Sequence, residues 1–232
     1  MTEHTSKKFD AELEGIRTRV LQMGGMVELQ IVKAMEGLGG GDLLLIDQVI
    51  ENDNRVNLLE IELDEACNQV IAKRQPTAVD LRMVSTVQKT ITDLERIGDE
   101  AKKIAKTAKQ LHTATSPFMP QIRLGHIADA VVDMLRTALD AYARLDTISA
   151  AQVVRHDKEV DAEFKGIMRQ LITYMIEDPR TISQAIELMF VAKSVERIGD
   201  HAKNIAEYVV YMVKGRDVRH TSLEEIEREA TR

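Results

Sequence analysis

The sequence predicts an all-α protein made of two tandem up-down-up three-helix bundles related by internal duplication. The eleven residues 95–105, E-R-I-G-D-E-A-K-K-I-A, return at residues 196–206 as E-R-I-G-D-H-A-K-N-I-A, with nine positions identical. Apolar residues recur at steps of three and four along most of the chain, as they do on the buried face of a helix. Aromatic residues are only 3% of the sequence, which favours helices over a β-sandwich or barrel.

The first predicted helix spans about residues 9–38. It contains Gly24 and Gly25, and two helical glycines together cost roughly 1–2 kcal/mol of helix stability. We therefore expect a neighbouring helix to pass close to them. Three glycines at residues 39–41 end this helix, and Asp42 is placed to cap the next.

The second and third predicted helices complete the first half. The second spans about residues 46–70 and ends near Arg74, because the residue before Pro76 is disfavoured in helical conformation. The third begins after Pro76 and carries the first copy of the repeated segment. Its apolar stripe alternates steps of four and three and consists of Val87, Ile91, Leu94, Gly98, Ala101, Ala105 and Ala108.

The second half repeats this order. Helices are predicted over about residues 124–145, over 153–171 with an end before Pro179, and over 188–209. The stripe of the last helix is Leu188, Ala192, Val195, Gly199, Ala202, Ala206 and Val209. Residues 222–229 form either a short extra helix or a frayed tail.

The only cluster of Pro, Ser and Thr lies at residues 113–120, so we predict one domain over residues 1–115 and a second over 116–232. Short connections make successive helices antiparallel neighbours. Helices of 30 or more residues would make each bundle about 45 Å long.

Composition limits the class of protein. The single Cys67 excludes an intrachain disulfide, and its place in an apolar stripe predicts a core residue. No apolar signal region or run of about 18 apolar residues occurs, so we expect a cytoplasmic protein. A net charge of −7 with mixed signs argues against nucleic acid as the main ligand.

Acidic residues interrupt two of the apolar stripes. Asp53 stands between Val49 and Val56 where an apolar residue is expected, and Asp157 interrupts the later helix in the same way. One turn on from these two residues come Asn57 and Asp161.

Two further acidic pairs lie beside the stripes of the repeated segment. These pairs are Glu95 with Asp99, and Glu196 with Asp200. Like charges four residues apart destabilise a helix, and a bound cation would reverse that effect. Oxygen ligands suit hard cations such as Mg²⁺, Ca²⁺ or Mn²⁺, and carboxylate iron sites also exist. We therefore predict metal binding by Asp53, Asn57, Glu95, Asp99, Asp157, Asp161, Glu196 and Asp200.

The alternative is that the acids form ordinary surface ion pairs. The cations near enough in sequence to do this are Arg55, Arg96, Lys102 and Arg197. His156 and His201 stand beside two of the acids and could add ligands, although solvated surface side chains are the more common outcome.

No catalytic motif is present. The sequence has no Glu-x-x-His pair of a di-iron bundle, no phosphate-binding glycine loop and no nucleophile with a base. We therefore predict no catalytic residues, and the mixed charge leaves room for a protein partner. The alternative is a metal-dependent phosphohydrolase, or a bundle that stores metal or phosphate, using the same carboxylates.

The duplicated E-R-I-G-D-x-A-K-x-I-A segment resembles the PhoU family of phosphate-transport accessory proteins. The segment A-K-R-Q-P-T-A-V-D-L-R at residues 72–82 and M-G-G-M-V-E at residues 23–28 strengthen the resemblance, which covers nearly the whole chain. It implies a helical, usually dimeric cytoplasmic regulator that represses the phosphate-starvation response. The implied partners are the ATPase subunit of a phosphate ABC transporter and a sensor histidine kinase of the PhoR type, with membrane contact only through them.

The resemblance also implies metal binding through E(D)-x-x-x-D motifs, with ions such as Mg, Mn, Fe or Zn. These motifs fall on the eight residues given above. Asn57 replaces an acid and Lys103 stands where the second copy has Asn204, so the first half is expected to bind metal more weakly.

Overall fold

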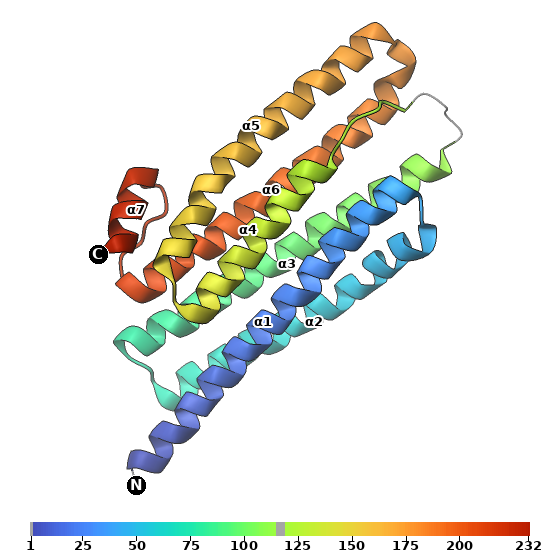
Figure 1. Cartoon of the computed structure of the whole chain (residues 1–232). Helices are drawn as coiled ribbons and strands as arrows, with labels where there is room; N and C mark the ends of the chain where they lie inside the picture. The colour runs from blue at the N-terminus through green and yellow to red at the C-terminus, as the bar shows by residue number, and fades with distance from the viewer. Residues whose placement is uncertain (1, 115–118) are drawn as a thin grey trace.

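The computed structural model describes residues 2–114 and 119–232, with side chains from Lys8 onward (Figure 1). Every regular element in this part of the chain is helical, which confirms the predicted all-α class. In chain order the elements are α1 (Thr2–Gly40), α2 (Leu43–Arg74), α3 (Ala78–Thr113), α4 (Gly125–Arg144), α5 (Thr147–Glu177), the 3₁₀ turn η1 (Pro179–Thr181), α6 (Ile182–Lys214) and α7 (Leu223–Thr231).

The helix ends follow local chemistry. Asp42 and Asp146 begin α2 and α5 in the same way, because each side chain accepts hydrogen bonds from the backbone N–H groups two and three residues later. Gln75 ends α2 in the left-handed conformation at φ 49°, immediately before Pro76. Gly215 ends α6 at φ 74°, a conformation that glycine adopts without strain.

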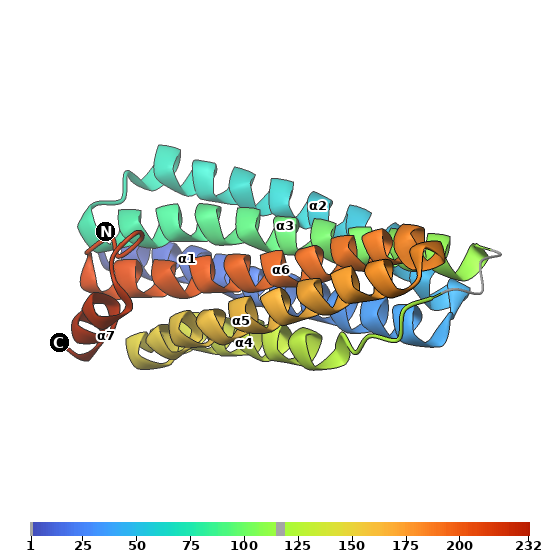
Figure 2. The same cartoon turned by 90° about the horizontal axis from the view of Figure 1, so that it is seen from above.

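The helices pack as two groups of three. Helices α1, α2 and α3 contact one another, and so do α4, α5 and α6 (Figures 1 and 2). Both predicted α3 and α6 stripes are buried. Each fully buried Val, Leu or Ile contributes roughly 1.5–3 kcal/mol relative to exposure. The predicted domain boundary between residues 115 and 116 lies outside the described residues.

The two halves lie against each other along their length. Figure 2 shows α3 and α6 side by side and running in opposite directions, and α1 also contacts α4. The duplicated segment occupies the middle of both α3 and α6, so its two copies meet at this α3–α6 interface. The sequence analysis predicted two bundles but did not predict that the repeated helices would pair.

Two details differ from expectation or settle an alternative. Helix α4 spans Gly125–Arg144, close to the predicted range of about 124–145, but its 20 residues are fewer than the 30 or more expected of the bundle helices in general. The segment after α6 forms a helix, α7, which packs on α5: Thr147 Oγ1 donates to the carbonyl oxygen of Ala230 at 2.7 Å. Within the described residues, no helix combines the length and the apolar character needed to cross a membrane.

The glycine pair in α1 marks a close approach to α4. A Cβ at Gly24 would lie 2.5 Å from a methyl carbon of Leu139, whereas a Cβ at Gly25 would have no neighbour within 4 Å. The expected close neighbour is therefore present at Gly24 alone.

Replacing each glycine by alanine tests this packing. Gly25→Ala should raise the free energy of unfolding by about 0.5–1 kcal/mol, because alanine is the better helix former and space is open. Gly24→Ala should gain less, because the buried Leu139 must move. Urea denaturation of both variants measures the difference, and equal gains would contradict the packing described.

Candidate functional site

Asp53 is the most deeply buried of the predicted metal ligands. Its side chain on α2 is 0% exposed, and Lys102 on α3 donates from Nζ to Asp53 Oδ2 at 2.6 Å. The same Nζ lies 3.8 Å from Asp99 Oδ1. The hydrogen bond to Asp53 raises the pKa of Lys102, so the lysine is charged at neutral pH.

The second half repeats this ion pair. Lys203 donates to Asp157 Oδ2 at 2.6 Å, and Asp157 is buried on α5. Burial opposes the charge on Lys203, but the hydrogen bond to Asp157 and the negative charges of Asp157, Glu207 and Asp200 together outweigh it, so the pKa of Lys203 is raised. Sequence reasoning considered Lys102 only as a surface partner and missed Lys203. The available signal was that lysine occupies the eighth position in both copies of the repeated segment.

Two further acids of the repeated segment, Glu95 on α3 and Asp200 on α6, lie close to other carboxylates. Burial, and then the charges of Asp99, Glu60 and Asp53, raise the pKa of Glu95. In the second half, burial followed by the charges of Glu196 and Asp157 raises the pKa of Asp200. In each half the charges of acids on two helices therefore add to the effect of burial.

The predicted ligands do not converge into a complete carboxylate metal site. Within the described part of the chain, no three His, Cys, Asp or Glu side chains are arranged to hold one metal ion. Asn57 donates weakly to Asp53 Oδ2 at 3.4 Å, and Asp161 lies half-buried one turn beyond Asp157. Metal binding by the eight residues remains a prediction.

Buried oxygens without partners nevertheless gather in the first half. Asp53 Oδ1, Asn57 Oδ1 and both amide atoms of Gln30 have no hydrogen-bond partner among the described residues. A Cβ at Gly98 would lie 3.3 Å from Gln30 Oε1 and 3.5 Å from Asp53 Oδ1, so these two oxygens face the same point. One carboxylate and two amide oxygens suit a hard cation. Gln30, a buried polar residue three positions after the buried Val27 on α1, was not among the predicted ligands.

The corresponding point in the second half is apolar. A Cβ at Gly199 would lie 3.3 Å from a methyl carbon of Val131 and 3.5 Å from one of Val160. The glycines of both copies therefore make room for side chains of the preceding helices. The polar Gln30 distinguishes the first half from the second.

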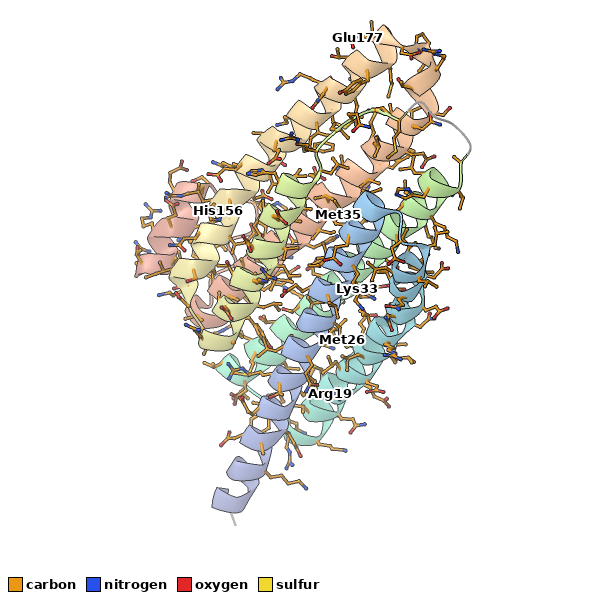
Figure 3. The ribbon with its side chains drawn as sticks, turned by 45° about the vertical axis from the view of Figure 1, so that its right-hand side comes forward. Arg19, Met26, Lys33, Met35, His156 and Glu177 are labelled. Carbon is orange, nitrogen blue, oxygen red and sulfur yellow. The ribbon has the colours of Figure 1, made fainter. Side chains whose placement is uncertain are left out.

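The α3–α6 interface carries its own buried acid, Asp93, which is 2% exposed. Asp93 Oδ1 lies 2.6 Å from His201 Nδ1 and accepts from Asn204 Nδ2 at 3.2 Å. The expectation that His201 is a solvated surface residue is wrong, because its side chain is half-buried against the other half. His156, in contrast, is exposed on α5 (Figure 3).

Glu100 is the second buried acid of this interface. Lys103 Nζ lies 2.8 Å and Arg197 Nη1 3.4 Å from Glu100 Oε1. Burial alone would raise the pKa of Glu100, but hydrogen bonds from Lys103 and Ser194, together with the charges of Lys103 and Arg197, outweigh it and lower the pKa. Lys103 was expected to place its charge near the first metal site; the structure pairs it with Glu100 instead.

The two copies of the repeated segment enclose an open cleft of about 520 Å³. Its lining residues are Arg96, Asp99, Glu100, Lys103, Arg197, Asp200, His201, Lys203 and Asn204. Both signs of charge are present, so the cleft can form salt bridges with charged side chains of a partner protein.

Glu207 extends the acidic row of α6 by one turn beyond Lys203. It is 7% exposed, and burial raises its pKa to about 7 despite the opposing charge of Lys203. The charge of Asp157 raises it further. Glu207 therefore titrates near neutral pH.

Replacing Lys102 by Met tests the buried ion pair. Lys102→Met should lower the free energy of unfolding by about 3–5 kcal/mol, because it leaves a buried carboxylate without its cation. Lys109→Met is the control, since Lys109 pairs with Asp47 at 2.7 Å but both side chains are well exposed. That change should cost at most about 1 kcal/mol in urea denaturation. Equal losses of unfolding free energy in the two variants would show that the buried Asp53 does not need Lys102 as its counter-ion.

Replacing Glu207 by Gln tests its titration. The raised pKa means that the folded protein binds the proton more tightly, so the contribution of Glu207 to stability falls as the pH rises from about 4.5 to about 7. Between pH 5 and pH 8, the free energy of unfolding of Glu207→Gln should therefore rise by up to about 3 kcal/mol relative to that of the wild type. Urea denaturation at both pH values measures this change in unfolding free energy, with Glu159→Gln at an exposed position as control. A gain in stability that did not change with pH would refute the titration of Glu207.

Comparison with known proteins identifies relatives over nearly the whole chain. Residues 20–108 and 124–209 match the PhoU domain. The phosphate-specific transport system accessory protein PhoU of Serratia marcescens is 48% identical over 229 residues, covering 98% of this chain and 93% of that protein. The protein of the same name from Escherichia coli K12 is 47% identical over 229 residues, covering 98% and 94%.

Solved structures agree with the sequence comparison. The crystal structure of PhoU from Pseudomonas aeruginosa superposes with a TM-score of 0.84 and 46% identity, covering 90% of this chain and 100% of that one. The phosphate transport system regulatory protein PhoU from Streptococcus pneumoniae gives a TM-score of 0.84 at 25% identity, covering 90% and 99%. The matching domain, the duplicated segment and the shared fold together show that this chain belongs to the PhoU family.

Proposed function

We propose that this protein is a non-enzymatic regulator of phosphate transport that represses the phosphate-starvation response when phosphate is plentiful. The observation that carries the proposal is similarity over nearly the whole chain to proteins named as accessory and regulatory components of phosphate transport systems. Such a role requires binding to other proteins rather than chemistry on a small substrate.

The proposed partners are the ATPase subunit of a phosphate ABC transporter and a sensor histidine kinase, contacted in the cytoplasm by a homodimer. Exposed apolar side chains on long, straight helices support protein docking. One set lies where α5 and α6 meet, near Glu177 at the far end of the second half (Figure 3). Its members are Ile172, Ile176, Ile182, Ile186 and Phe190.

We further propose that hard cations stabilise the two acidic clusters. A bound cation would relieve the repulsion that raises the pKa values of Glu95 and Asp200. The proposed ligands remain Asp53, Asn57, Glu95 and Asp99 in the first half, and Asp157, Asp161, Glu196 and Asp200 in the second.

Deletion of the gene tests the regulatory role. We expect a phosphate-starvation reporter to be expressed in phosphate-rich medium when the protein is absent, because the repressing contact is lost. A plasmid copy of the wild-type gene should restore repression, and Lys109→Met should restore it equally. Reporter output that stays low after deletion would refute the proposed role.

A further inference from the structure

A small pocket lies in the groove between α1 and α2 of the first half. Its volume is about 120 Å³, and Met26 and Lys33, two turns apart on α1, mark its position in Figure 3. We call it the α1–α2 pocket; its lining residues are Met26, Leu29, Gln30, Lys33, Val49, Asn52 and Arg55. A water molecule takes about 30 Å³ of liquid volume, and pockets for drug-sized ligands begin at about 300 Å³. A ligand of this pocket must therefore be small.

Every charge that lines the α1–α2 pocket is positive. Its ionisable side chains are Lys33, half-buried on α1, and Arg55, exposed on α2. Neither forms an ion pair with another residue of the described chain. Two cations around one small space repel each other, and both are attracted to an anion that lies between them. Ammonium and guanidinium groups are common protein ligands of oxyanions.

Two amide side chains add hydrogen-bond donors to the pocket. Gln30 is 5% exposed, yet its amide nitrogen has no acceptor in the described part of the chain. The side chain of Asn52, half-buried on α2, also makes no hydrogen bond there. Because buried polar atoms are nearly always satisfied by protein, water or an ion, these nitrogens are donors that a bound oxyanion can satisfy. Asp53 does not line the pocket, and Lys102 balances its charge at 2.6 Å.

The second half shows that the fold does not require these polar side chains. The offset that relates Gly98 to Gly199 assigns the counterparts on α4, and the offset that relates Asp53 to Asp157 assigns those on α5. Val131 lies beside Gly199 as Gln30 lies beside Gly98, which supports the assignment. The counterparts of Gln30, Lys33 and Arg55 are Val131, Met134 and Glu159. The same bundle therefore forms with two apolar residues and an acid where the first half has an amide and two cations.

We infer that the α1–α2 pocket binds one small dianion, a tetrahedral oxyanion with the charge and size of hydrogen phosphate. A phosphate monoester carries roughly −1.5 to −2 charges at neutral pH, which the two pocket cations match. Lys33 and Arg55 bind its oxygens, and Gln30 and Asn52 donate from their amide nitrogens. Free inorganic phosphate and the phosphate group of a small ester share this chemistry. The inference requires neither the metal binding nor the regulatory role proposed above.

The test is isothermal titration calorimetry of the full chain with inorganic phosphate, at neutral pH and fixed ionic strength. EDTA in the buffer prevents phosphate from binding through a metal ion. The double variant Lys33→Gln with Arg55→Gln should bind phosphate at least about ten-fold more weakly than the wild type, because both charge-assisted contacts are lost. The control, Lys106→Gln with Arg169→Gln, removes the same charge from two exposed residues on other helices that form no ion pair in the described chain. Its affinity should stay within about two-fold of the wild type, because distant surface charges are screened by salt.

Replacing Gln30 by Met separates a role in binding from a role in packing. Methionine keeps the length of the side chain and removes the unpartnered amide, so without phosphate the melting temperature should stay the same or rise. The affinity of Gln30→Met for phosphate should nevertheless fall at least about five-fold. Saturating phosphate should raise the melting temperature of the wild type more than that of the variant. A lower melting temperature with unchanged affinity would assign Gln30 to packing alone and overturn its role as a donor.

Two further ligands identify the class of anion. Tighter binding of phenyl phosphate than of inorganic phosphate would assign the pocket to an ester, and the reverse order would assign it to the free ion; both support the inference. Acetate, a monoanion, should bind at least about ten-fold more weakly than the better of the two. Equally tight binding of acetate would overturn the assignment to a dianion.

Three results would overturn the pocket itself. They are no binding of inorganic phosphate or phenyl phosphate to the wild type at millimolar concentration, unchanged affinity in Lys33→Gln with Arg55→Gln, and an equal loss of affinity in the control. Circular dichroism establishes that each variant is folded, so that a loss of binding is not a loss of structure. None of these results bears on the regulatory role, which rests on the reporter experiment.

Discussion

One buried ion pair in each half fixes how its helices fit together. Asp53 and Asp157 stand in core stripes, where a charge without a partner would be strongly destabilising. Lys102 and Lys203 reach them from the neighbouring helix at 2.6 Å, so each ion pair favours the one register in which its two atoms meet. Apolar packing alone would tolerate a shift of a turn more easily.

The α3–α6 interface shows why the two copies of the repeated segment are not identical. Equivalent positions of α3 and α6 lie near each other, because both copies line the same cleft. The copies differ at two positions, where Glu100 corresponds to His201 and Lys103 to Asn204. All four residues line the cleft at this interface, and unlike residues there replace the like-charge contacts that an exact repeat would create.

These differences also give the halves different chemistry. Asp93 contacts His201 across the interface. Ser194, which occupies the position of Asp93 in the second half, hydrogen-bonds to Glu100 instead. The first half buries Gln30, where the second has Val131. The lysine–aspartate pair is thus present in both halves, whereas its surroundings differ between them.

Periodicity and the internal repeat determined the helices, their order and the buried stripes, because burial of one helix face depends only on local spacing. The same spacing identified Asp53 and Asp157 as acids in the core. The tertiary structure alone decided which cation meets them and that Gln30 lies beside Gly98, because these contacts join helices far apart in the chain. It also decided the pairing of α3 with α6, since a three-helix repeat does not specify which surface faces its copy.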